Sequence, residues 1–297
     1  MTTRTPSVTP VGIPSPTPPA GPRKRSAARS YTLITGCTLA GLIALLALVS
    51  YVWLPYALDD TSGGRLTAPG ADHVLGTDKL GRDLFTQVMN GSRIAVQAGL
   101  GSVLIAATIG VTLGVLAAFA EGWLDDTVSA FLDILIAFPT LLLAMLIVAA
   151  RSATLSSAVL AIGLAQSAIV ARLVRILVKR VLALDYITAA RTSGTSWIRI
   201  VAGHVLPNIW PTLIVNLALQ FGLAVLAEAG LSYLGLGAPP PHASWGRMLQ
   251  EAQATFTTAP AGALAPGILL VLLVIGVNLI ADGLRDTLDP ATKSRRA

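Results

Sequence analysis

Long stretches without a charged residue are the feature of this 297-residue sequence that most limits its possible folds. Six predominantly apolar intervals between charged residues contain 17 to 30 residues each. A helix of about 20 apolar residues crosses the roughly 30 Å hydrocarbon core of a bilayer and satisfies its own backbone there. The intervals therefore predict six membrane-spanning helices. We place them at residues 32–54, 95–119, 128–150, 154–175, 210–233 and 263–284.

The alternative interpretation is that the six intervals form buried helices of a large soluble core. Hydrophobic residues make up 54% of the chain and charged residues only 12%, whereas a soluble domain carries about 25% charged residues. Too little polar surface would remain to coat six such helices. The composition favours an all-α, polytopic membrane protein. It argues against a monomeric soluble enzyme and against a disordered chain.

The first apolar interval follows a basic cluster, Arg23, Lys24 and Arg25, as the apolar part of a secretory signal peptide would. The interval is too long for that role, and no small-residue cleavage site follows it. We therefore predict a retained first transmembrane helix at residues 31–55. Residues 1–30 are rich in Pro, Ser and Thr, and we expect them to form a disordered cytoplasmic tail.

The distribution of basic residues predicts how the chain lies in the membrane, because Lys and Arg gather in cytoplasmic loops. With the N-terminus inside, the inner segments hold 15 of the 21 basic residues and the outer segments hold 6. Both termini are thus predicted in the cytoplasm of a multi-pass protein of the inner or plasma membrane. The net charge of +6 is explained by topology and by attraction to lipid, so it does not indicate nucleic acid binding.

The predicted spans divide the remaining chain. Residues 56–94 form an extracytoplasmic segment, residues 95–286 hold the other five helices, and residues 287–297 form a cytoplasmic tail. We expect the part from 95 to 286 to be one transmembrane domain.

A long inner loop at about residues 180–208 separates the fourth and fifth spans. Basic and apolar residues alternate in it at helical spacing, which is typical of helices lying at a membrane surface. Asp185 can begin such a helix and Gly194 can end it. Pro207 is expected to break the chain before the fifth span.

This loop resembles the EAA signature of ABC importer permeases. The signature reads Glu-Ala-Ala, three residues, Gly, nine residues, an apolar position, one residue, and Leu-Pro. The residues that match it are Ala189, Ala190, Gly194, Leu206 and Pro207. Thr188 stands where the signature has Glu, and His204 stands at the apolar position.

Four further blocks resemble the permeases for dipeptides, oligopeptides and nickel. They are residues 73–96, 110–143, 227–249 and 277–290. Because the blocks follow in order and in register, the chain is identified as a member of this permease family. The pattern is similar to the C-type member of the permease pair. The resemblance implies the type I ABC importer transmembrane fold with six helices.

The resemblance also implies partners. A homologous B-type permease would complete the pore, two ATPase subunits or domains would bind beneath it, and an extracytoplasmic binding protein would deliver the cargo. Thr188, Ala189, Ala190, Gly194, Leu206 and Pro207 would form the loop that couples to the ATPases. The sequence has no G-x-x-x-x-G-K-[ST] motif, so we expect a non-catalytic subunit without a cofactor, and ATP with Mg on the partners.

Two residues near the spans are candidates for a gate or a pore lining. Ionisable residues near membrane depth are functional candidates because burying them is costly. We interpret Glu228 first as a buried acid paired with a neighbour and second as part of an outer gate. Pro139 is interpreted first as a helix kink and second as a gate. The three histidines lie in separate loops, so no metal site is expected.

Peptides are the predicted cargo, and the resemblance leaves uptake of nickel or haem by the same architecture open. A self-contained secondary transporter or channel ranks lower, because it would need intramembrane charge pairs or internal repeats. An integral membrane enzyme would need clustered His, Asp or Glu residues at one membrane depth. The sequence indicates neither pattern.

Overall fold

The computed structural model describes residues 25–120 and 122–288. Within these residues the chain is helical, with one isolated β bridge between Thr77 and Asp83. The tails predicted at residues 1–30 and 287–297 fall largely outside the described residues, and their described parts, 25–30 and 287–288, belong to helices instead.

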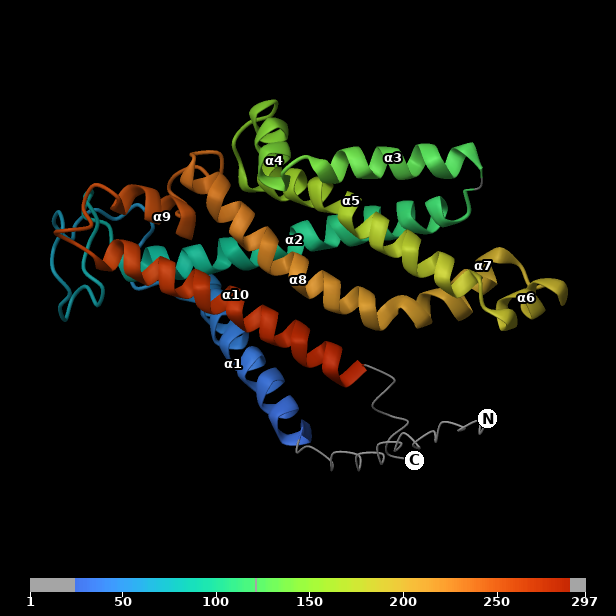
Figure 1. The fold of residues 1–297 in the computed structure, drawn as a ribbon. Coiled ribbons are helices and arrows are strands. Elements are labelled where there is room, and N and C mark those ends of the chain that lie inside the picture. Colours follow the sequence, from blue (N-terminus) through green and yellow to red (C-terminus); the bar gives the residue numbers. More distant parts are fainter. Residues whose placement is uncertain (1–24, 121, 289–297) are drawn as a thin grey trace, which may run out of the picture.

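Figure 1 shows the order and arrangement of the helices. They are α1 (Arg25–Val52), α2 (Leu84–Ala118), α3 (Trp123–Ala137), α4 (Thr140–Ala149), α5 (Leu155–Leu182), α6 (Asp185–Thr192), α7 (Trp197–Ile200), α8 (Leu206–Tyr233), α9 (Trp245–Ala252) and α10 (Ala261–Leu288), and a π-helical turn at Val201–Val205 joins α7 to α8. Five helices are long and apolar enough to span a bilayer, and α3 with α4 makes a sixth span if the bent pair is counted as one. The predicted all-α, polytopic class is confirmed.

Helix α2 begins at Leu84, well before the span predicted from residue 95. The Asp83 side chain caps it by accepting a hydrogen bond of 2.7 Å from the Thr86 N–H. Arg93 lies inside the helix because α1 supplies its partners. Its guanidinium donates to the Ser50 carbonyl and lies 4.0 Å from the centroid of the Tyr51 ring. A charge satisfied in this way does not end an apolar helix.

Helices α3 and α4 meet at an angle of 85°, at Phe138 and Pro139. A residue before proline is pushed toward extended backbone, and Phe138 has φ −74° and ψ 129°. The predicted kink at Pro139 is therefore confirmed, and it divides the third span into two helices.

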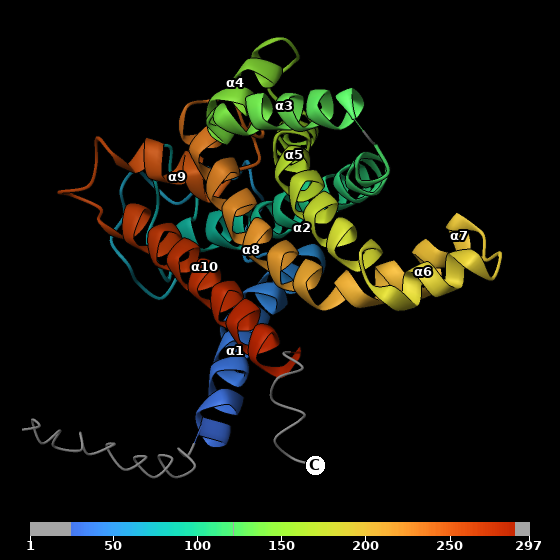
Figure 2. The same ribbon diagram turned by 45° about the vertical axis from the view of Figure 1, so that its right-hand side comes forward.

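Helices α2 and α5 pack closely along much of their length, and both views show them side by side (Figures 1 and 2). Glycines make this approach possible, since a side chain would overlap the neighbouring helix. A Cβ on Gly110 would lie 2.6 Å from the Val170 Cβ, and one on Gly163 would lie 2.7 Å from the Ile105 Cβ. Small residues of this kind are the usual contact between membrane helices. Helices α1 and α10 pair likewise, where a Cβ on Gly36 would lie 2.7 Å from the Gly276 carbonyl oxygen.

One end of the molecule is closed by residues 53–83 together with α9, which we call the cap (Figure 1). Polar links hold it to itself and to α2. The Arg82 guanidinium lies 2.7 Å from Glu251 of α9 and 2.6 Å from Asp78. The Trp245 indole donates to the Val88 carbonyl over 3.1 Å. The cap is therefore joined across residues that are far apart in the sequence.

Candidate functional site

The segment between α5 and α8, residues 183–205, lies at the opposite end of the molecule from the cap (Figure 1). We call it the connecting segment. Its first helix, α6, begins at Asp185, and an acid in the first turn is favoured by the helix dipole. Gly194 follows its end in the left-handed conformation, with φ +80°. The start and stop predicted for this helix are confirmed.

Two backbone hydrogen bonds close α6 in a Schellman motif. The Gly194 N–H donates to the Arg191 carbonyl over 3.0 Å, and the Thr195 N–H donates to the Ala190 carbonyl over 3.1 Å. A Cβ on Gly194 would meet no atom within 4 Å. Glycine is thus required at this position by backbone conformation rather than by space.

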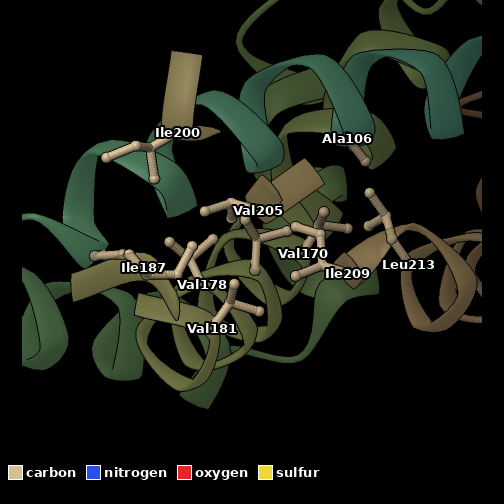
Figure 3. Packing of buried hydrophobic residues seen from close by; sticks show 11 residues of the cluster. Ala106, Val170, Val178, Val181, Ile187, Ile200, Val205, Ile209 and Leu213 are labelled. Atoms are coloured by element: carbon tan, nitrogen blue, oxygen red, sulfur yellow. The ribbon is translucent and has the colours of Figure 1, made fainter. Parts of the chain in front are cut away.

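Apolar side chains fix the connecting segment to the membrane helices (Figure 3). Ile187, Ile200 and Val205 are fully buried in one cluster with Val178 and Val181 of α5. Each large apolar side chain that is buried contributes about 1.5–3 kcal/mol relative to exposure. The segment is consequently docked on α5 rather than loosely tethered.

Residues that follow Ile187 on α6 are the ones predicted to couple to an ATPase. Thr188 and Ala189 are exposed, and Ala190 is half-buried. These short side chains leave the helix surface open to close approach by another backbone. The structure brings the three residues together on one helix with Gly194 at its end, and their role in coupling stays a prediction.

Leu206 and Pro207 begin α8, and the break expected at Pro207 is wrong. A continuous helix runs from Trp197 to Tyr233 through the π-helical turn at Val201–Val205. Proline lacks the N–H that would bond the carbonyl four residues earlier. The wider π turn takes up this mismatch, with the Leu206 N–H donating to the Val201 carbonyl.

A polar contact joins α6 directly to α8. The Asn208 side-chain amide donates to the Tyr186 hydroxyl over 2.8 Å, and the rings of Tyr186 and His204 lie 6.0 Å apart, edge to face. Sequence reasoning missed Tyr186 and Asn208 because their spacing carries no local signal. Through this contact, a movement of α6 would be passed directly to the spanning helix α8.

Glu228 lies near the end of α8 and only 1% of its surface is exposed. Its Oε1 accepts a hydrogen bond of 2.5 Å from the Ser232 hydroxyl, one helical turn later. The structure thus gives Glu228 a partner in its own chain. This agrees with the interpretation as a buried, partnered acid, and the gate role is untested.

Pro139 and Glu228 lie on neighbouring elements. A Cβ on Gly230 of α8 would lie 3.5 Å from Leu141 of α4, and these two residues follow Glu228 and Pro139 closely in sequence. Pro139 itself is exposed. The bend between α3 and α4 therefore abuts the same stretch of α8 that carries the buried acid.

An ion cluster that the sequence did not predict fastens α3 to α5. Asp125 in the first turn of α3 pairs with both Arg175 and Lys179 of α5. Farther along the same helices, Asp133 lies 3.1 Å from Arg172. No local signal in the sequence indicates these pairs, because their formation depends on how α3 folds back along α5.

The three histidines lie far apart in the sequence and on different elements, so they do not form one site. His73 lies in the cap, where its Nδ1 is 3.0 Å from Asp83, whereas His204 lies in the π turn and His242 before α9. In the part of the chain that the structure describes, no three His, Cys, Asp or Glu side chains are grouped as a metal site requires.

Solved structures share this fold. Two crystal forms of the inward-facing MetNI methionine ABC transporter match with TM-scores of 0.58 and 0.57, at 20% and 21% identity. Each match covers 68% of this chain and 96% of the other. At this identity the likeness concerns the fold alone, which is the transmembrane fold of an ABC importer.

The sequence comparisons give the family. Residues 110–294 match the binding-protein-dependent transport system inner membrane component. The chain belongs to this family, and it is a multi-pass inner membrane permease subunit of an ABC importer that acts with other ABC subunits.

Three curated relatives illustrate the range of the family. The dipeptide transport system permease protein DppC of Alkalihalophilus pseudofirmus is 40% identical, over 88% of this chain and 84% of its own length. The glutathione transport system permease protein GsiD of Pectobacterium atrosepticum is 39% identical, over 86% and 87%. The nickel transport system permease protein NikC of Escherichia coli is 36% identical, over 85% and 91%.

Proposed function

We propose that this chain forms half of the translocation pore of an ATP-driven importer of peptides. A second, homologous permease of the B type completes the pore. An extracytoplasmic binding protein delivers the peptide to the cap, and two ATPase subunits or domains bind the connecting segment from the cytoplasm. Both termini lie in the cytoplasm. The observation that carries the proposal is a short helix, α6, in which Thr188 and Ala189 are exposed while Ile187 is packed on the membrane helices.

The mechanism follows from how α6 is held. The partner ATPases bind ATP with Mg and supply the energy, so this chain has only to receive a force. A docked helix transmits a push, whereas a loose loop would dissipate it. Burial of Ile187 transfers the displacement of α6 to α5, and the Tyr186–Asn208 hydrogen bond transfers it to α8. The two spanning helices then move together.

Because residue 188 is Thr rather than Glu, the proposed contact between α6 and the ATPase lacks one charge. The exposed surface of α6 is still present. Thr188 is exposed and carries a hydroxyl that can hydrogen-bond a partner. We expect Thr188→Glu to support uptake at or above the natural level, as measured with labelled dipeptide. A complete loss of uptake in this variant would contradict the orientation of α6 proposed here.

Cysteine cross-linking tests the coupling surface directly. The only native cysteine is Cys37, so Cys37→Ala provides a clean background. In that background, Thr188→Cys should cross-link to an ATPase subunit in the complex purified through this chain. Val74→Cys in the cap, where the side chain is 63% exposed, is the matched control and should give no such product. Cross-linking of the cap variant alone would invert the proposed orientation.

Uptake by the same complex tests the cargo. Three relatives are named for dipeptides, glutathione and nickel, and the absence of a three-residue metal cluster among the described residues gives no separate support to nickel. We expect ATP-dependent uptake of labelled dipeptides, with competition by unlabelled peptides. Uptake of nickel without competition by peptides would reject the peptide assignment while leaving the importer assignment intact.

A further inference from the structure

A cavity of about 740 Å³ opens between the connecting segment and the ends of α2 and α5. Its walls are Ala118, Phe119, Ala120, Lys179, Leu182, Arg191 and Trp197. This volume lies in the range of about 300–1,000 Å³ that is typical of small-ligand sites. The proposed coupling mechanism uses none of these side chains, so the cavity needs a separate explanation.

Among the described residues that line this cavity, Lys179 and Arg191 are basic and none is acidic. Lys179 and Arg175 share one carboxylate, that of Asp125, so two cations face one anion. Arg191 makes no ion pair with any residue in the described parts of the chain. A site built in this way favours an anion, and it offers an ammonium and a guanidinium as donors.

Arg191 is held in an orientation that suits a phosphate. Its guanidinium carbon lies 4.3 Å from the centroid of the Trp197 ring, and the Phe119 ring meets Trp197 edge to face at 4.8 Å. Stacking occupies the flat face of a guanidinium and leaves its in-plane N–H groups free for bidentate bonding. The aromatic pair thereby fixes the donors before any ligand arrives.

The other residues that line the cavity are apolar, and exposed apolar side chains lie near them in sequence on α2 and α3. Leu116 and Leu113 of α2, one and two turns before Phe119, are 64% and 46% exposed. Trp123 at the start of α3 is 73% exposed, as an aromatic residue at a membrane interface is. A ligand that fits therefore has an anionic head in the cavity and an apolar tail along α2.

We propose that the cavity binds the phosphate headgroup of an anionic phospholipid through Arg191 and Lys179. Basic pockets between membrane helices on the cytoplasmic side are recognised sites for such headgroups. The lipid would join α6 and α7 to the end of α2, and so stiffen the segment that receives the push. The effect on transport rests on the proposed function, whereas lipid binding itself does not.

Native mass spectrometry on the complex purified through this chain tests the binding. The probe is phosphatidylglycerol at about one third of the lipid in phosphatidylcholine nanodiscs. One basic residue near an anionic headgroup is worth about a fivefold change in affinity. We expect Arg191→Gln to lower lipid retention about fivefold and Arg191→Gln with Lys179→Gln to lower it further. Arg191→Lys should retain more lipid than Arg191→Gln.

Arg180→Gln is the matched control, because Arg180 is exposed at the same end of α5 but does not line the cavity. It should retain lipid as the natural protein does. Equal loss in Arg180→Gln and Arg191→Gln would overturn the proposal in favour of diffuse surface charge. Displacement of phosphatidylglycerol by inorganic phosphate, with Arg191-dependent phosphate binding in pure phosphatidylcholine nanodiscs, would assign the cavity to a soluble anion instead.

Two further outcomes separate this proposal from the proposed function. If Arg191→Gln releases the ATPase subunits while lipid retention is unchanged, the cavity is a protein contact and the lipid proposal is wrong. If the natural complex retains the lipid specifically but imports no peptide, the lipid site stands and the cargo assignment fails.

Discussion

The cap and the connecting segment lie at opposite ends of the same helices, and different interactions hold them. In the cap, Arg82 bridges Asp78 and Glu251, and Trp245 donates to the backbone of α2. In the connecting segment, Ile187 and Ile200 are buried in one cluster with residues of α5, whereas Thr188 and Ala189 of α6 are exposed. Arg82 and Trp245 of the cap are thus paired within the molecule, whereas the connecting segment leaves a surface open for a partner.

Gly246→Ala should break the cap most severely. A Cβ at this position would overlap the Ala229 carbonyl of α8, and backbone cannot move aside as a flexible side chain can. We expect the cap to detach and monodisperse protein to be lost in size-exclusion chromatography. Gly222→Ala is the control, because its Cβ would lie 3.8 Å from the nearest atom. Normal yield of Gly246→Ala would show that the cap packs differently.

Ile187→Ala should undock the connecting segment. Replacing a fully buried isoleucine by alanine costs about 2–5 kcal/mol of stability. Because Ile187 belongs to α6, this change weakens the packing of α6 and leaves the spanning helices themselves intact. We expect dipeptide uptake to fall strongly while the amount of chain in the membrane changes little. Ile198→Ala in the same segment, where the side chain is 83% exposed, should leave uptake unchanged. Equal uptake in the two variants would contradict apolar docking.

Arg82→Gln tests the polar fastening of the cap. Breaking a buried ion pair costs about 3–5 kcal/mol, and we expect about 2 kcal/mol because Glu251 still meets Arg247. The measurement is the thermal midpoint of the purified complex. Arg65→Gln is the control, since Arg65 is exposed in the same loop and should shift the midpoint little. Similar shifts for both would mean that the Arg82 cluster does not hold the cap.

Gly194→Val should have the smallest effect on stability among these variants. It should nevertheless weaken the coupling of ATP hydrolysis to uptake. A residue with a Cβ in the left-handed region costs about 1–2 kcal/mol, while a Cβ at this position would meet no atom within 4 Å. We expect ATP hydrolysis to continue with reduced uptake. Gly194→Asn should preserve more uptake, because asparagine tolerates this conformation. Normal transport by the valine variant would reject Gly194 as part of the coupling element.

Local signals in the sequence were sufficient for features decided by a few neighbouring residues. The kink at Pro139 follows from its missing N–H and the restraint on Phe138. The end of α6 follows from Gly194. The same kind of reasoning failed at Pro207, because a π turn upstream absorbed the proline instead of ending the helix. A proline in the sequence shows where a backbone hydrogen bond is missing. Whether the helix ends, kinks or forms a π turn there depends on the neighbouring residues and helices.

Features that join distant residues were beyond the sequence. That α2 runs through Arg93 depends on the contacts of Arg93 with Ser50 and Tyr51 of α1. The cavity near Arg191 depends on the ends of α2 and α5 lying close to the start of α7. Neither arrangement has a characteristic spacing, since the partners are brought together only by packing.

The amino-acid sequence by itself determined that this chain spans a membrane several times, because bilayer thickness sets the length of an apolar helix regardless of its neighbours. The sequence also showed the family resemblance, and it predicted the short helix that carries Thr188, Ala189 and Ala190. Tertiary structure alone decided which charges are paired, which face of α6 is buried and where a positive cavity opens. Those properties depend on contacts between helices, and small residues such as Gly110 and Gly163 permit the contacts without specifying their partners.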